Sequence, residues 1–123
     1  MRYLLDANAV IFALTGHPRV LARFADCDEG DLALSAIAFA EVSLGIARGK
    51  PPSPDVMAGF LEEVAVVPFD EQAARRYAML PFRRGNFDRL IAAHALSLDL
   101  TLVTNNEADF ADIPGLRIEN WTR

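Results

Sequence analysis

The chain has 123 residues, 52% of them hydrophobic, and carries a formal net charge of −5 with a pI near 4.9. The length fits a single domain, residues 1–123, and the hydrophobic content excludes intrinsic disorder. The acidic balance argues against a protein that grips nucleic acid through a broad basic surface, because neutralising phosphates requires Lys and Arg. It is compatible with acids gathered around a cation, and also with a protein covered by a basic partner.

Strands and helices are predicted to alternate along the chain. Apolar or β-branched runs predict strands at 2–5, 32–34, 64–69, 101–104 and 116–118, and the run 64–69 should be buried. Periodicity and capping residues predict helices at 9–14, 18–25, 35–47, from 53 or 55 to 63, 70–80 and 87–98, with a helical turn at 107–112. This order predicts an α/β domain with a mainly parallel sheet and helices on both faces.

The sequence shows no sign of export or of a cysteine-based site. No apolar run is long enough to span a bilayer, and the N-terminus lacks an export signal, so we expect a soluble cytoplasmic protein without membrane contact. Cys27 is the only cysteine. It can form neither an internal disulfide nor a thiolate metal site by itself, and we interpret it as a packing residue.

Asp88 is the most informative acid. Ile91, Ala92 and Ala95 lie on the same face of its predicted helix, which is the face that should be buried. A carboxylate at the head of a buried stripe is costly unless a cation or several donors meet it. The alternative is a first-turn acid that interacts with the helix dipole, but this alternative does not explain the apolar face.

Glu41 repeats this pattern on the helix predicted at 35–47. The residues at helical spacing around it are small or apolar, namely Ile37, Ala38, Leu44 and Gly45. A glutamate is rarely buried without a partner, so a positive group should face it. A salt bridge to Arg48 or Arg89 is an equally good explanation of Glu41 when it is considered alone.

Asp6 ends the first predicted strand, and Asn105 and Asn106 follow the fourth. In sheets of this type ligands bind outside the carboxyl ends of the strands, so these residues should share one rim. Asp6 has an alternative role as a helix cap, although Asn8 could take that role instead. Asp6, Glu41 and Asp88 together point to a site for a hard cation such as Mg²⁺ or Mn²⁺, which carboxylates and water hold without Cys or His.

The remaining polar residues are less specific. His94 points away from the face of Asp88 and is interpreted as a packing or surface residue, and His17 receives no role. The densest basic group comprises Arg75, Arg76, Arg83, Arg84 and Arg89. It could contact RNA phosphates or an acidic segment of a partner, and a solvated surface is an equally good reading.

Four segments occur in the order found in the PIN-domain nucleases. They are Leu4-Leu5-Asp6-Ala7-Asn8, Ser35 to Val42 with Glu41, Asp88 to Ala95, and Leu102-Val103-Thr104-Asn105-Asn106 followed by Asp109-Phe110. The match resembles the VapC-type toxins of bacterial toxin–antitoxin pairs, and the ending from Leu116 to Trp121 is similar to theirs. Each segment is a weak signal alone, but all of them in order are specific and cover nearly the whole chain.

This resemblance implies a PIN-like, doubly wound sheet and a metal-dependent endoribonuclease that uses Mg²⁺ or Mn²⁺. It also implies a homodimer and inhibition by a cognate VapB-type antitoxin. Asp6, Glu41 and Asp88 match the three central metal-binding acids, which we expect to be the catalytic set. Many relatives carry an Asp in a Thr-x-Asp segment where this chain has Asn106, so Asp109 is the expected, weaker fourth ligand.

Rival functions fit less well. A phosphoacceptor receiver domain needs a lysine after a late strand, but Lys50 is the only lysine and it precedes Pro51. A phosphatase with an aspartyl nucleophile needs a second acid two residues after Asp6, where Asn8 stands. The main alternative is a catalytically inactive PIN-like module that binds RNA or protein, and the intact set of three acids argues against it.

Overall fold

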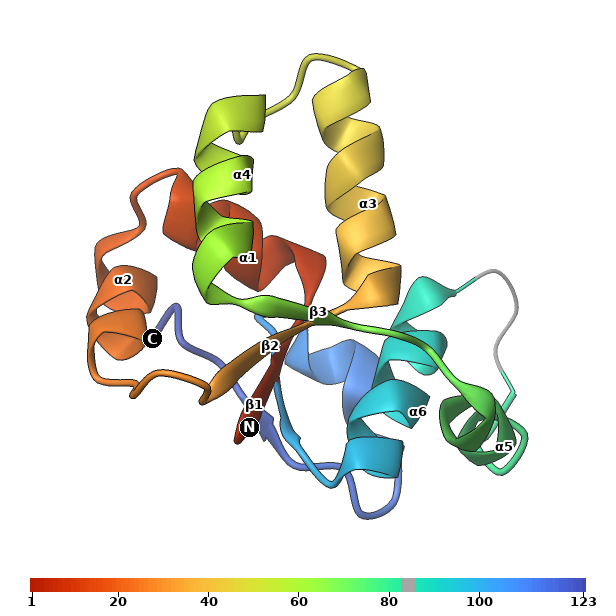
Figure 1. Ribbon diagram of the computed structural model, residues 1–123. Coiled ribbons are helices and arrows are strands. Elements are labelled where there is room, and N and C mark those ends of the chain that lie inside the picture. The colour runs from red at the N-terminus through yellow and green to blue at the C-terminus, as the bar shows by residue number, and fades with distance from the viewer. Residues whose placement is uncertain (83–85) are drawn as a thin grey trace.

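The computed structural model describes residues 1–82 and 86–123, which form a five-stranded sheet with the order β3-β2-β1-β4-β5 (Figure 1). The strands are β1 (Tyr3–Leu5), β2 (Leu32–Ser35), β3 (Ala65–Val67), β4 (Thr101–Val103) and β5 (Ile118–Glu119). The helices are α1 (Ala7–Leu14), α2 (Pro18–Ala25), α3 (Ala36–Ala47), α4 (Pro54–Glu63), α5 (Glu71–Tyr77), α6 (Phe87–Leu98) and the short 3₁₀ helix η1 (Glu107–Phe110). All four strand pairings are parallel, which confirms the predicted α/β class.

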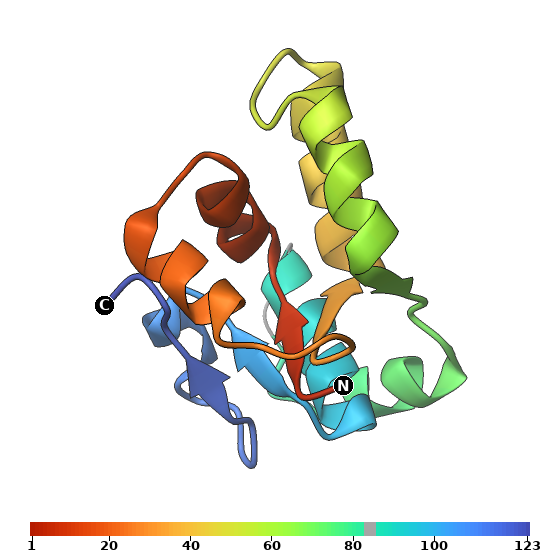
Figure 2. The same ribbon diagram turned by 60° about the vertical axis from the view of Figure 1, so that its left-hand side comes forward.

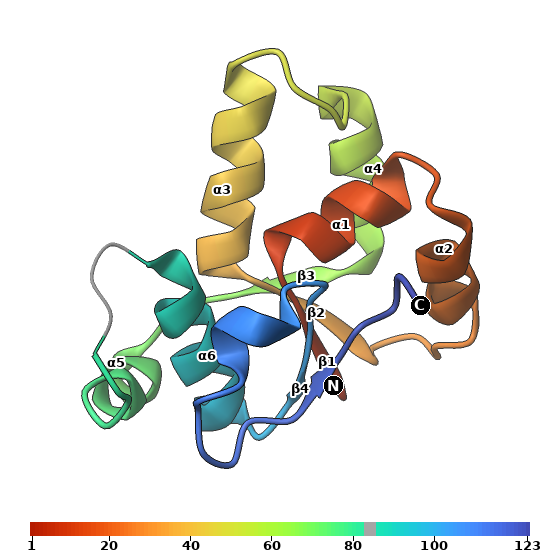
Figure 3. The same cartoon turned by 180° about the vertical axis from the view of Figure 1, so that it is seen from behind.

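The sheet is doubly wound about β1. The chain passes outward from β1 to β2 and β3, and then returns through α5 and α6 to β4 on the other side of β1. The pairs α1–α2 and α5–α6 lie on opposite sides of the sheet, while α3 and α4 run side by side away from it (Figures 1, 2 and 3). The strand order therefore reverses between β1 and β4, and a crevice at the carboxyl ends of these strands is where such sheets bind ligands.

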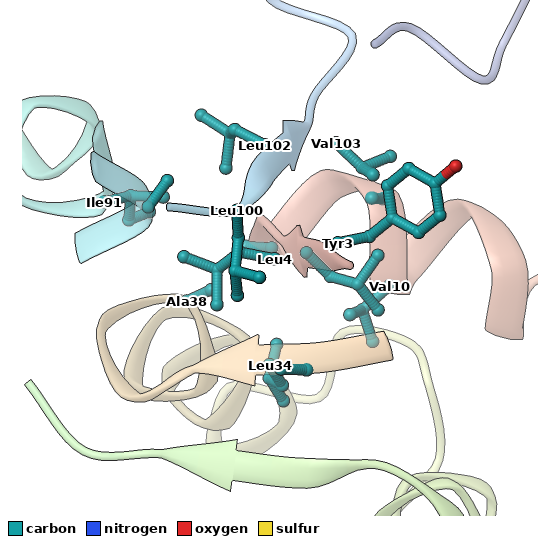
Figure 4. Packing of buried hydrophobic residues seen from close by; sticks show 14 of the residues in the cluster. Tyr3, Leu4, Val10, Leu34, Ala38, Ile91, Leu100, Leu102 and Val103 are labelled. Carbon is teal, nitrogen blue, oxygen red and sulfur yellow. The ribbon is translucent and has the colours of Figure 1, made fainter. Parts of the chain in front are cut away.

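The core lies on the three central strands. Leu4, Leu34 and Leu102 come from β1, β2 and β4 and are fully buried, with Ala38 of α3 and Ile91 of α6 packed against the same cluster (Figure 4). Strands covered on both faces need continuous apolar runs of this kind. Burying each leucine contributes about 2 kcal/mol, so the central strands form a rigid base for the side chains that follow them.

Side chains before the helices fix where the helices begin. Ser35 accepts a hydrogen bond from the Ile37 amide, and Asp70 accepts one from the Ala73 amide, as the sequence predicts. His17, which received no role, caps α2 in the same way. The helix after Asp70 ends at Tyr77, earlier than predicted.

The prediction of a buried strand at 64–69 is wrong. The strand covers only Ala65–Val67, and Ala65 and Val66 are exposed. The physical reason is the position of β3 at the edge of the sheet, where it pairs with β2 alone. In the part of the chain that the structure describes, no helix is both long enough and apolar enough to cross a lipid bilayer.

Candidate active site at the carboxyl edge of the sheet

Asp6 directly follows β1 and is only 5% exposed. One of its carboxylate oxygens accepts a hydrogen bond of 2.8 Å from the Ala9 amide, so Asp6 rather than Asn8 caps α1. Burial raises the pKa of Asp6 to about 6, and the charge of Asp88 adds to this rise, whereas hydrogen bonds from the Thr104 side chain and the backbone oppose it. Asp6 therefore caps α1 and at the same time lies at the carboxyl edge of the sheet, so the two roles considered for it do not exclude each other.

Glu41 lies on α3, the helix that starts at the carboxyl end of β2. Burial raises the pKa of its partly buried side chain, and the charges of Asp88 and Asp6 raise it further. The alternative salt bridge to Arg48 or Arg89 is not formed, since no cation within residues 1–82 and 86–123 pairs with Glu41. Its negative charge thus faces the other acids without compensation from the described part of the protein.

Asp88 lies in the first turn of α6, and Asn86 accepts a hydrogen bond from its backbone amide. Because α6 runs back against the direction of the strands, its N-terminus lies at the same edge as Asp6. Burial raises the pKa of the Asp88 carboxyl. Asp109 raises this pKa further, by its charge and by a side-chain hydrogen bond, whereas Arg89 lowers it. Ile91, Ala92 and Ala95 are all buried, as the helical spacing predicts.

Asp109 belongs to η1, which follows the carboxyl end of β4. The side-chain amide of Asn106 donates a hydrogen bond to Asp109, and the Asn106 backbone amide bonds to the Thr104 hydroxyl at 3.1 Å. The residue that replaces the expected acid in the Thr-x-Asp segment therefore orients Asp109 toward the site. Asn8 and Asn105 are joined by a 3.4 Å hydrogen bond across the segments that follow β1 and β4.

The chemistry of these acids fits a hydrated divalent cation. No group of three or more Asp, Glu, His or Cys side chains in the described ranges is close enough to hold a metal ion directly. Mg²⁺ keeps several of its waters and is usually bound through only one or two carboxylates, so direct ligation by all the acids is not required. The charges of Asp6, Asp88 and Asp109 each raise the pKa of a neighbouring carboxylate, and a cation among them would relieve this repulsion.

Sequence reasoning gave Thr104 no role of its own and assigned Arg89 to a different one, yet both residues are buried beside the acids. Thr104 is 1% exposed, and its side chain is hydrogen-bonded to Asp6. The sequence feature that could have pointed to it is a hydroxyl residue at the end of an apolar strand. Arg89 is also 1% exposed and pairs with Asp112 at 2.8 Å, so it is not available to an RNA phosphate at the surface. His94 is buried rather than at the surface, and its ring lies 2.9 Å from the Ser35 hydroxyl.

The arginines of the predicted basic group lie in different environments, as far as the structure describes them. Arg75 is exposed and pairs with Glu71 on its own helix at 3.4 Å, while Arg76 is partly buried. Arg83 and Arg84 lie outside the described residues.

Comparison with known proteins agrees with this geometry. The sequence model of the PIN domain matches residues 3–116. The chain belongs to the PIN-domain family. The tRNA(fMet)-specific endonuclease VapC of Salmonella typhimurium is 31% identical, with 98% of each chain covered. Ribonuclease VapC2 of Rickettsia felis is 31% identical over the full length of both chains. This PIN domain is therefore of the VapC type.

The fold of this PIN domain is also shared by solved VapBC structures. VapBC2 from Rickettsia felis, bound to a DNA fragment from its promoter, contains a chain with a TM-score of 0.87 and 30% identity. The match covers 98% of this chain and 99% of that one. It confirms the doubly wound PIN fold that the sequence order implies.

Proposed function

We propose that Asp6, Glu41 and Asp88 hold a divalent metal ion, Mg²⁺ or Mn²⁺, with which this VapC-type toxin cleaves RNA phosphodiester bonds. The observation that carries this proposal is the convergence of three acids, one directly after β1, one on α3 and one on α6, each with a raised pKa. In residues 1–82 and 86–123 none of the three pairs with a cation. Such a cluster destabilises a protein that binds no cation and fits one that does.

The acids are suited to different parts of this task. Asp6 is held by hydrogen bonds from the Ala9 amide and the Thr104 side chain, so it would offer the ion a carboxylate in a fixed position. Glu41 and Asp88 are less buried, which leaves their oxygens accessible to water and to a substrate phosphate. Asp109 lies beside Asp88 and would be a further, weaker ligand of the ion. When bound, the ion activates a water molecule and stabilises charge on the leaving oxygen.

RNA is the substrate, and a VapB-type antitoxin is the partner of this toxin. The relatives are named ribonucleases, and the similar solved structures are VapBC complexes. An acidic pocket of this kind is complementary to a basic side chain, so we expect the antitoxin to inhibit by placing one against Asp6, Glu41 and Asp88.

The proposal is tested by incubating the purified protein with mixed RNA in the presence of Mg²⁺, Mn²⁺ or chelator. We expect cleavage with metal only, and at least a hundredfold loss of rate in Asp6→Asn, since a ligand to the ion is lost. Asp26→Asn is the matched control, because Asp26 is an exposed aspartate at the end of α2. Metal-independent cleavage, or equal rates for wild type and folded Asp6→Asn, would contradict the proposed site.

The alternative of an inactive binding module predicts a different result. Such a protein binds RNA without cleaving it under any of these metal conditions. In cells, we expect the chain expressed without antitoxin to arrest growth and Asp6→Asn to relieve the arrest. Sequencing the RNA ends produced during the arrest identifies which RNA is cut.

A further inference from the structure

A groove between α1 and α3 begins at the acidic site. Its cavity has a volume of about 360 Å³, and Glu41 lies in its wall. Arg48, the residue that caps the C-terminus of α3, and Lys50, in the loop that follows, also line it. One groove therefore contains a carboxylate of the candidate metal site and two cationic side chains.

The charges in this groove are separated along the helix. Glu41 and Arg48 are seven residues apart, which is about two turns, so they share one face of α3 at an axial separation of about 10 Å. Arg48 and Lys50 are both exposed. Neither pairs with a carboxylate in residues 1–82 and 86–123. The basic end of the groove is therefore open to an anion, in a protein whose net charge is −5.

The middle of the groove is lined by apolar residues. Ile11 lines it from α1 and Leu44 from α3, and Leu44 is 52% exposed although it is a large apolar side chain. Gly45 lies on the same wall and presents no side chain. An ideal Cβ at Gly45 would meet only Lys50, at an ordinary van der Waals distance of 3.8 Å. Exposed apolar side chains beside cations can contact the sugar and base of a nucleotide whose phosphate the cations hold.

We propose that this groove binds the nucleotide next to the cleaved bond, with Arg48 and Lys50 holding its phosphate. This inference rests on the proposed function, since it extends the RNA path from the candidate metal site. The charge order favours RNA over an acidic peptide, because an RNA strand carries a phosphate at every nucleotide and can present one to a metal ion at the Glu41 end and another to the cations at the other end.

Binding of a short, labelled single-stranded RNA of mixed sequence tests this proposal. The measurement is fluorescence anisotropy in chelator, so that no cleavage occurs, at several salt concentrations. We expect Arg48→Gln combined with Lys50→Gln to weaken binding roughly tenfold at low salt. The slope of log affinity against log salt should become shallower by about 0.7 for each RNA phosphate that the double variant no longer neutralises.

Two controls separate this groove from general electrostatics. Arg19→Gln removes an exposed charge on α2, outside the groove, and should leave the affinity close to that of wild type. Arg48→Lys retains the charge and should keep most of the affinity. The proposal that this groove binds RNA would be overturned by a double variant that melts like wild type yet binds RNA with the wild-type affinity and the wild-type dependence on salt. Absence of metal-dependent cleavage by wild type would instead overturn the proposed function, so the two failures are distinguishable.

Discussion

Arg89 and Asp112 connect the two segments that carry Asp88 and Asp109. One terminal nitrogen of the buried Arg89 guanidinium donates to both carboxylate oxygens of Asp112, at 2.8 and 3.0 Å. Arg89 directly follows Asp88 on α6, and Asp112 lies three residues beyond Asp109. The ion pair therefore holds η1 against the N-terminus of α6, and with it the distance between the two acids.

We predict that Asp112→Ala destabilises the protein more than Arg89→Met does. Asp112→Ala leaves a buried guanidinium without its carboxylate, which costs about 3–5 kcal/mol. Arg89→Met removes the buried charge itself and leaves Asp112, whose side chain is 38% exposed, in contact with solvent. Urea denaturation of both variants and of the double variant measures the difference. A greater destabilisation by Arg89→Met would show that packing of the long side chain, rather than its charge, dominates.

Asp6→Asn should stabilise the metal-free protein at neutral pH. The folded-state pKa of Asp6 is about 6 against an ordinary value of 3.8, so the folded state holds a proton that the unfolded state releases. The resulting penalty is absent below pH 3.8, grows as the pH rises through 6, and reaches roughly 3 kcal/mol above it. Asparagine caps a helix as well as aspartate does, so the variant escapes this penalty while α1 keeps its cap.

The measurement is the free energy of unfolding of both proteins from pH 4 to pH 8 in chelator. The curves should converge near pH 4 and separate by up to about 3 kcal/mol at pH 8. A constant offset between them at every pH would mean that Asp6 does not carry the raised pKa. Asp26→Asn again serves as the exposed control.

Asp88→Asn should raise stability without metal and remove the stabilisation that metal gives. Asp109 lies beside Asp88, and losing one of two neighbouring charges relieves their repulsion. Allowing for solvent screening, we expect a gain of about 1 kcal/mol or less, or roughly 4 °C in Tm. Thermal melts with chelator and with Mn²⁺ measure both effects. A variant that melts lower without metal but keeps the full metal-induced shift would remove Asp88 from the site.

Thr104→Val should raise the pKa of Asp6 further. The Thr104 side chain is hydrogen-bonded to Asp6 and lowers this pKa, and valine has the same shape without the hydroxyl. Titration of the Asp6 carboxyl by ¹³C NMR in metal-free protein measures the change. Thr104→Ser keeps the hydroxyl and should restore the wild-type value. An unchanged pKa in Thr104→Val would mean that the Thr104 hydroxyl does not stabilise the Asp6 carboxylate.

The sequence indicated where the acids lie better than it indicated which residues support them, and the metal-binding role of Asp6, Glu41 and Asp88 stays a prediction. Asp88 and Glu41 were recognisable because a carboxylate in an apolar helical stripe breaks a periodic pattern. Thr104 and Arg89 break no pattern, and their roles depend on which strand and loop lie beside them in space. The burial of residues 64–69 was mispredicted for the same reason, because apolar composition does not reveal whether a strand lies at the centre or the edge of a sheet.

The order of the strands has a consequence for when the site can form during synthesis. β1 is made first, but β4 is one of its two neighbours in the sheet, and β4 begins only at Thr101. Asp6 also receives its Thr104 bond only after β4 has paired. A partly synthesised chain therefore contains Asp6 and Glu41 without an assembled site. The ribosome that makes this ribonuclease has therefore completed most of the chain before the acids can form one site.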